Sequence, residues 1–303
     1  MTDQSPDAPI CLAIPFFSGL DYLLLALRSL IDQTDPGWTA IVVDDASPED
    51  GAEKTVAEIG DRRVRYVRNE CNLGVAGNFN RCVELASAEA PVVVVFHGDD
   101  ELAPRYVAAV RDAHRAFPDA TCVAPRVTVI DGAGRPARTI ADTVKALLWP
   151  RNLPMVLEGD DGLAKLMRGL FFYCPSVSYR VDLLPKVRFD TRWRQVMDLD
   201  LYSRVLLDGG SIAVFPDRVY RYRRHGATMT AANSRSLVRL DEETQVCREV
   251  VSAARGKGWR RSVAAAQLRG TVRLNGLLEA LRLVVCRQLR LALTATRQSV
   301  VGR

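Results

Sequence analysis

The sequence predicts an α/β protein with a mainly parallel central sheet, helices on both faces of the sheet, and a helical C-terminal extension. Short apolar and β-branched runs alternate with segments of helical periodicity up to residue 124, and the run at 92–96 is apolar at every position. Strands that are buried on both faces and alternate with helices are typical of a parallel sheet. The same pattern divides the chain into a main domain at 1–230 and a basic helical extension at 231–303.

The elements before residue 68 follow from the spacing of apolar residues. Residues 10–14 form an apolar run closed by a proline, 39–43 are rich in β-branched residues, and 63–67 alternate, so each predicts a strand. Leucine and isoleucine recur at helical spacing over 20–31, and 49–59 predicts a shorter helix.

The elements from residue 75 to residue 124 continue the alternation. Residues 75–86 and 106–117 have helical spacing, whereas 92–96 and 121–124 are short apolar runs that predict strands. Ligands bind to such sheets beyond the carboxyl ends of the strands, so we expect the functional site at that rim.

Regular patterns are sparser after residue 124. The stretch 131–159 is rich in Gly, Pro and Arg without a clear period, which predicts a long loop over the site. Residues 162–170 and 198–207 predict helices, 212–215 predict a strand, and the chain is expected to be helical from residue 231 onward.

Composition indicates a globular protein of a reducing compartment. The seven cysteines are scattered and form no C-x-x-C pair, which argues against a disulfide framework or a zinc site. No stretch has the roughly 18 consecutive apolar residues of a membrane span. The first ten residues have no basic and apolar signal regions, so we expect a cytoplasmic protein.

The C-terminal extension is strongly basic. Residues 248–303 carry twelve Lys or Arg and two Glu, while the other 247 residues carry 29 basic and 34 acidic side chains. Apolar residues share one helical face over 274–293, and most arginines fall on the other. This helix could pack on the main domain, dimerise, or contact anionic lipid through 269–297 on the inner face of the membrane. No nucleic-acid motif is present, so no nucleic-acid partner is expected.

Two pairs of carboxylates follow directly after expected strands. Asp99-Asp100 comes after the run 92–96, and Asp44-Asp45 comes after 39–43, so both pairs belong at one rim of the sheet. Adjacent carboxylates repel each other, and Mg²⁺ or Mn²⁺ offsets that repulsion. Solvated turns or helix caps are the structural alternatives, and Asp44-Asp45 could also accept hydrogen bonds from a nucleoside.

Further polar residues stand near the start of a helix and at the end of the main domain. Asp198 and Asp200 open an expected helix, where the helix dipole alone would favour them. His225, one of three histidines, follows Arg223 and Arg224 in a segment with a plausible role in phosphate binding.

The order of these stretches resembles the family 2 glycosyltransferases of the GT-A fold, over roughly residues 9–230. The resemblance rests on ICLAIPFFSGLDYLLLALRSLIDQT, WTAIVVDDASPED, RNECNLGVAGNFNRCVELA, VVVVFHGDDELAP, RFDTRWRQVMDLDLYSRVLLDGG and YRYRRHG. It implies a nucleotide-diphospho-sugar donor, with uridine the commonest base among similar enzymes, and a glycan or lipid-linked acceptor. It also implies a divalent cation, Mn²⁺ or Mg²⁺.

The resemblance also implies roles for individual residues. Asp198 matches the base that takes the acceptor proton, which implies direct displacement with inversion, and Tyr173 and Ser176 are expected near the acceptor. Asp99 matches the metal-binding acid, and His225 approaches the metal or the diphosphate. The expected donor contacts are Pro15, Phe17, Asp44, Asp45, Asn72, His97 and Asp99.

Two departures from the family pattern keep alternatives open. His97 stands where an acid is usual in the Asp-x-Asp segment, and Met197 stands where a Glu precedes the base. A catalytically silent nucleotide-sugar-binding scaffold at a membrane is therefore one alternative. A nucleotidyltransferase is another, although the segment after the first strand lacks the basic phosphate loop that it would need.

Overall fold

The computed structural model describes residues 9–184, 188–225 and 238–268, together with residues 270, 273 and 276. The chain forms two compact units, each drawn from separate stretches. The first comprises Met1–Val156, Phe172–Phe189 and Gly210–Arg224, and the second comprises Leu157–Phe171, Asp190–Gly209 and His225–Arg303. The boundary near residue 230 stays a prediction.

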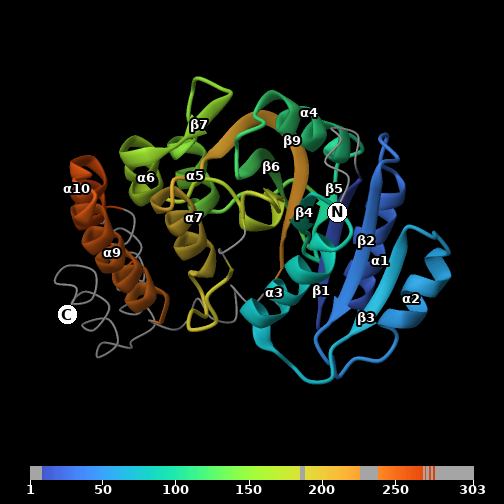
Figure 1. The fold of residues 1–303 in the computed structure, drawn as a ribbon. Helices are drawn as coiled ribbons and strands as arrows, with labels where there is room; N and C mark the ends of the chain where they lie inside the picture. Colours follow the sequence, from blue (N-terminus) through green and yellow to red (C-terminus); the bar gives the residue numbers. More distant parts are fainter. Residues whose placement is uncertain are drawn as a thin grey trace. The chain divides into compact units, whose positions relative to one another are not determined.

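A nine-stranded sheet with the order β3-β2-β1-β4-β8-β6-β9-β5 forms the framework, and β7 pairs with β9 (Figure 1). The strands are β1 (Ile10–Phe16), β2 (Trp38–Asp44), β3 (Val64–Arg68), β4 (Val92–Val95), β5 (Glu101–Leu102), β6 (Cys122–Asp131), β7 (Met155–Leu157), β8 (Ser178–Arg180) and β9 (Ile212–Arg224). Strands β1 to β4 are parallel, as are β6 and β9, while β5 and β8 are antiparallel to their neighbours. The predicted mainly parallel α/β fold is confirmed.

Alternation along β1 explains why helices cover both faces of the sheet. Ile10, Leu12 and Ile14 are buried in a core cluster with residues of α1 (Leu20–Ile31), α2 (Ala52–Ile59) and α4 (Tyr106–Ala116). Cys11 and Ala13 are also fully buried and point to the opposite face, where α3 (Gly74–Ser87) packs on β1, β2 and β4. A strand with no solvent-facing side needs apolar residues at every position.

The stretch 131–159 is not the irregular loop that its composition predicts. It contains α5 (Ile140–Leu148) and β7. Thr139 and Asp142 form a capping box at the start of α5, with the Asp142 amide donating to the Thr139 side chain and the Thr139 amide donating to Asp142. The cap satisfies amides that lack partners within the helix, so this helix starts at a defined residue.

Other differences concern the lengths of elements. The strands expected at 121–124 and 212–215 extend to residues 131 and 224, because β6 and β9 pair along their length with a register shift around Arg126. Helix α2 begins at Ala52 with Gly51 before it, so Asp44 and Asp45 do not cap it.

Four helices form the described part of the second unit. They are α6 (Gly159–Arg168), α7 (Met197–Leu207), α9 (Val238–Gly256) and α10 (Arg260–Leu268). Helix α10 packs on α6 and α9, and the Ser262 hydroxyl donates to the Asp160 carboxylate at 2.6 Å. The helical character expected after residue 231 is confirmed for α9 and α10, whereas the basic segment 277–297 lies outside the described residues. None of the described helices combines the length and apolar character that crossing a membrane requires.

Candidate active site

Parallel pairing brings the ends of three strands to one rim of the sheet. In the register of β1 and β2, Phe16 is opposite Asp44, and the Asp45 amide donates to the Phe16 carbonyl at 2.9 Å. Pro15 is the second-last residue of β1. Phe17 is the first residue after the strand, and 47% of its surface is exposed. Strand β4 lies on the other side of β1, so its carboxyl end reaches the same rim.

Asp44 is 1% exposed and is held by four donors. Its Oδ1 accepts from the Ser47 amide at 2.7 Å, and its Oδ2 accepts from the Tyr66 hydroxyl at 2.6 Å and from Arg68 Nη1 at 2.8 Å. The Ser47 hydroxyl donates to Oδ2 as well. The buried carboxylate therefore fixes Tyr66 and Arg68, whose side chains reach the rim from β3.

Asp45 connects β2 to the segment before α3. Its Oδ1 accepts from Asn69 Nδ2 at 3.0 Å and from the Leu73 amide at 2.8 Å. Asn72 lies within this segment, and its side chain accepts from the Gly74 amide at 2.9 Å. Gly74 has a φ of 72°, a left-handed conformation that suits glycine and lets the helix start there. Oδ2 of Asp45 takes no part in these bonds.

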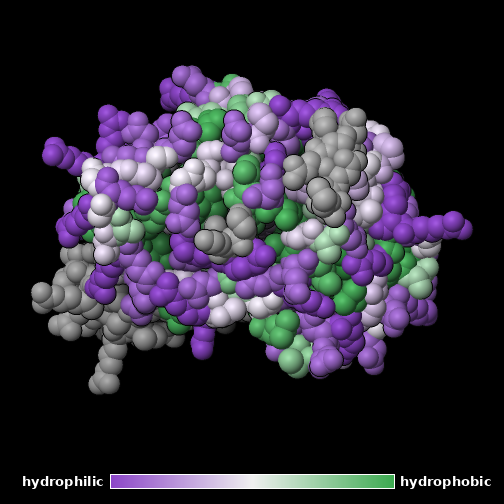
Figure 2. Space-filling model, in the orientation of Figure 1, coloured by the Kyte–Doolittle hydropathy of each residue, from purple (hydrophilic) through white to green (hydrophobic). Residues whose placement is uncertain are grey.

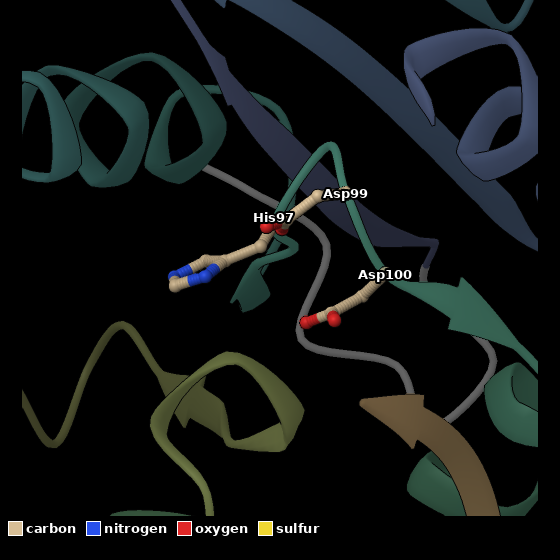
Figure 3. Close-up of side chains that lie close together, drawn as sticks. All are labelled: His97, Asp99 and Asp100. Carbon is tan, nitrogen blue, oxygen red and sulfur yellow. The ribbon is translucent and has the colours of Figure 1, made fainter. Parts of the chain in front are cut away.

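His97, Asp99 and Asp100 lie together in the turn after β4. One ligand atom from each of the three side chains lies within 4.8 Å of the others. Figure 3 shows the three side chains leaving this turn, with Asp100 on the side of β9. The His97 ring stacks at a tilt on Phe79 of α3, with 5.1 Å between ring centroids. An imidazole and two carboxylates are a suitable donor set for a divalent cation of the Mn²⁺ or Mg²⁺ type.

Asp100 is the buried member of the cluster and is tied to β9. Its Oδ2 accepts from the Tyr220 hydroxyl at 2.8 Å, and its Oδ1 accepts from the Arg223 amide at 2.6 Å. Burial, together with the negative charge of Asp99, raises the pKa of the Asp100 carboxyl well above its usual value. A cation bound at the cluster would offset this repulsion.

Arg223, a residue of β9, stabilises the acidic turn through its side chain. It is 1% exposed, its Nε donates to the Asp99 carbonyl at 2.8 Å, and it forms an ion pair with Glu101. Glu101 also pairs with Arg221 at 3.2 Å. These arginines stabilise the turn, and the phosphate-binding role expected of this segment stays a prediction.

Tyr173 and Ser176 belong to the turn that includes η1 (Cys174–Ser176), and both point into the protein. The Tyr173 hydroxyl donates to Asp142 at 2.8 Å, and the Ser176 hydroxyl donates to the Tyr173 carbonyl at 2.8 Å. Asp142 also binds the Arg224 guanidinium through three bonds of 2.6 to 3.1 Å. This polar cluster joins α5, the turn and the end of β9.

Asp198 and His225 belong to the second unit. Asp198 lies in the first turn of α7, as its position in the sequence predicts, and its Oδ1 accepts from the Leu199 amide at 2.8 Å. Asp200, two residues further along α7, is buried and pairs with Arg204 at 2.7 Å. His225 directly follows Arg224, the last residue of β9.

Several residues that shape the rim were not expected from the sequence. Tyr66 and Arg68 bind Asp44, and Tyr220 binds Asp100, but their partners lie more than twenty residues away along the chain. Asp142 did have a local signal, because Thr139 stands three residues before it in the spacing of a capping box.

Solved structures with this fold include complexes with bound nucleotide-sugars. S. aureus TarS 1–349 in complex with UDP-GlcNAc matches 96% of this chain and 81% of its own, with a TM-score of 0.68 and 20% identity. The mannosyltransferase PcManGT from Pyrobaculum calidifontis, in complex with GDP-Man and Mn²⁺, matches 97% of this chain and 85% of its own, with a TM-score of 0.61 and 15% identity. The sheet and its acidic turn thus define a protein of the GT-A class.

The chain belongs to Glycosyl transferase family 2, whose profile matches residues 11–184. An uncharacterized protein of Mycobacterium tuberculosis is 31% identical over 239 residues, which cover 72% of this chain and 67% of that protein. The succinoglycan biosynthesis protein ExoO of Rhizobium meliloti is 27% identical over 220 residues, which cover 73% of this chain and 61% of that protein. The match thus spans about two thirds of the length of these curated relatives.

Proposed function

We propose that this family 2 glycosyltransferase is an inverting, metal-dependent enzyme that moves a sugar from a nucleotide-diphospho-sugar to a hydroxyl acceptor. The observation that carries the proposal is the cluster of His97, Asp99 and Asp100, which stands on the same rim as Asp44 and Asp45. Two acidic turns at the ends of β2 and β4, which flank β1, suit a ligand that has a nucleoside at one end and a diphosphate at the other.

The donor nucleoside is assigned to the ends of β1 and β2. Asp45 would accept hydrogen bonds from the nucleoside through Oδ2, while Asp44 is also proposed to act by fixing Arg68 and Tyr66. Pro15, Phe17 and Asn72 complete the proposed donor contacts. UDP-GlcNAc in TarS and GDP-Man in PcManGT show that solved structures of this fold bind different bases, so the base is left to experiment.

The cation is assigned to Asp99, with His97 beside it and His225 as the further ligand that the family resemblance implies. Asp100 holds the turn through Tyr220 and the Arg223 amide. When bound, Mn²⁺ or Mg²⁺ would stabilise negative charge on the diphosphate leaving group. The oxygen and nitrogen donors of the cluster fit such an ion, and PcManGT carries Mn²⁺ in its solved complex.

Asp198 is assigned as the base that takes the acceptor proton as the hydroxyl attacks. It stands in the first turn of α7, and a positioned carboxylate can take the proton of an attacking hydroxyl. With one base and direct attack, the anomeric centre inverts. Tyr173 and Ser176 are proposed to shape the acceptor side through the turn that they hold. Because ExoO is a succinoglycan biosynthesis protein, a growing glycan is the proposed acceptor.

Thermal unfolding with nucleotides tests the donor site. We expect one of UDP, GDP, dTDP and CMP to raise Tm, and Mn²⁺ to increase that shift, because a ligand of the folded state stabilises it by mass action. Asp45→Asn should reduce the shift, whereas Asp217→Asn, on an exposed part of β9, should leave it unchanged. No shift with any nucleotide would contradict the proposed donor site.

A further inference from the structure

Helix α5 exposes its apolar residues instead of burying them. Ile140 and Leu147 are 71% and 80% exposed. They are seven residues apart, two turns of helix, so they share one face with the partly buried Val144 between them. A surface helix usually turns its apolar stripe toward the core and its charged residues toward water. Figure 2 shows hydrophobic residues reaching the surface near β7 and α5 among mostly hydrophilic ones.

The inward face of α5 explains this orientation. Asp142 is 4% exposed and is bonded to Arg224 and Tyr173. Lys145 donates to the Phe172 carbonyl at 2.9 Å and lies 4.1 Å from the centre of the Tyr173 ring. These polar contacts fix the rotation of the helix about its axis, and this rotation places the apolar stripe on the outside.

Arginines flank the helix at both ends. Arg138 stands just before the cap residue Thr139, and Arg151 stands three residues after the last helical residue, both of them exposed. Arg126 lies over the ring of Trp149, the C-cap residue, at 5.3 Å.

Arg218 pairs with Arg126 in the register of β6 and β9. Burial and the charge of Arg218 lower the pKa of Arg126, so two like charges are close together there. Asp217 is the exposed acid next to them in sequence. An anionic partner would relieve this repulsion.

We propose that the outward face of α5, formed by Ile140, Val144 and Leu147 and flanked by Arg126, Arg138, Arg151 and Arg218, docks on a bilayer that contains anionic lipid. Aliphatic side chains beside basic ones are the composition of a helix that lies in a membrane interface. A nine-residue helix cannot supply the roughly 800 Å² per partner of a stable dimer, and a second copy would bring the same arginines together. Aliphatic residues also offer no hydrogen bonds to the hydroxyls of a glycan.

Vesicle binding by the full chain tests this surface. We expect the protein to bind phosphatidylcholine vesicles that contain phosphatidylglycerol, and to bind vesicles of phosphatidylcholine alone about tenfold more weakly. Ile140→Ser combined with Leu147→Ser should lower the partition coefficient by about tenfold or more, since both side chains would lose their place in lipid. Leu25→Ser, at an exposed leucine of α1, is the matched control and should bind as the wild type does.

Other results would overturn the proposal. One is wild-type binding by the double serine variant, which would assign any membrane contact to another part of the chain, such as the basic extension. A second is the absence of wild-type binding to either vesicle. A third is a self-association in lipid-free buffer that the double variant abolishes, which would identify a second copy as the occupant. The nucleotide-induced rise in Tm should be unchanged in the double variant, so failure here is distinct from failure of the donor site.

Discussion

Asp99 and Asp100 are neighbours in sequence but have different surroundings. Asp100 is buried and accepts hydrogen bonds from Tyr220 and the Arg223 amide. Asp99 is partly exposed, and its backbone carbonyl accepts a hydrogen bond from the Arg223 side chain. The two carboxylates therefore have different roles, which their adjacent positions in the sequence do not reveal. Asp100 anchors the turn to β9, and Asp99 is the proposed ligand of the cation.

The first prediction concerns Asp99. Asp99→Asn keeps the size of the side chain but removes its charge, so we expect the Mn²⁺-dependent part of the nucleotide shift in Tm to disappear. The unfolding temperature without ligand should stay within a few degrees of wild type, because the Asp99 carbonyl still accepts the hydrogen bond from Arg223. Asp112→Asn, an exposed acid on α4, is the control. Full metal dependence in Asp99→Asn would contradict the assignment.

The second prediction concerns Asp198. Asp198→Asn should lower the transfer rate by about 10²- to 10⁴-fold, because an amide cannot accept the acceptor proton. The donor should still raise Tm as in wild type, since the proposed nucleoside contacts lie at the ends of β1 and β2. Asp208→Asn, at the C-terminal end of the same helix, should have little effect on rate. A variant with wild-type turnover would exclude Asp198 as the base.

At the scale of elements, helix α4 is fastened to β8 by a buried histidine. His114 Nε2 lies 2.9 Å from the Ser178 hydroxyl, and the side chain is mostly buried. Burial, with a smaller effect from the charge of Arg180, lowers the pKa of His114 to about 3. The folded protein thus keeps this imidazole neutral at pH values where the unfolded chain protonates it.

The third prediction follows from that difference. The unfolded state binds the proton below pH 6.5 and the folded state binds it only near pH 3. The free energy of unfolding should therefore fall as the pH falls from 6.5, with a contribution from His114 of at most about 1.4 kcal/mol per pH unit. His114→Gln should remove this contribution. Urea unfolding of both proteins at pH 7, 6 and 5 measures it, and parallel pH dependences would contradict the assigned burial.

Helix α5 shows why some elements could not be predicted from the sequence. Periodicity methods assume that apolar residues point to the core, and α5 does the opposite, with Ile140 and Leu147 outside and Asp142 inside. Its capping box is marked by Thr139 and Asp142, but the surrounding Gly and Pro favour a loop. Strands β5 and β8 have only two and three residues, too few to show a period.

At the scale of the whole molecule, the parallel half of the sheet was predictable because its strands are apolar on both faces. Alternating runs also placed Asp44, Asp45, Asp99 and Asp100 at strand ends, and the register of β1 and β2 confirms the position of the first pair. The partners that decide what each carboxylate does come from distant strands. Arg68 and Arg223 reach the rim only through tertiary pairing, which local sequence does not encode.

The proposed nucleotide-sugar contacts are residues of the first unit, and the proposed base, Asp198, is a residue of the second. The central claim is that these parts perform metal-dependent transfer with inversion. Water can serve as the acceptor in slow donor hydrolysis, so turnover is measurable before the natural acceptor is known.

The most direct test is the hydrolysis of the nucleotide-diphospho-sugar whose nucleotide raises Tm, followed by proton NMR from the first minutes of reaction. We expect the first sugar released to have the anomeric configuration opposite to that of the donor. We also expect nucleoside diphosphate release with Mn²⁺ or Mg²⁺ and little release in EDTA. A first product with the donor's own configuration, or release at equal rates with and without the metal, would contradict the proposed mechanism.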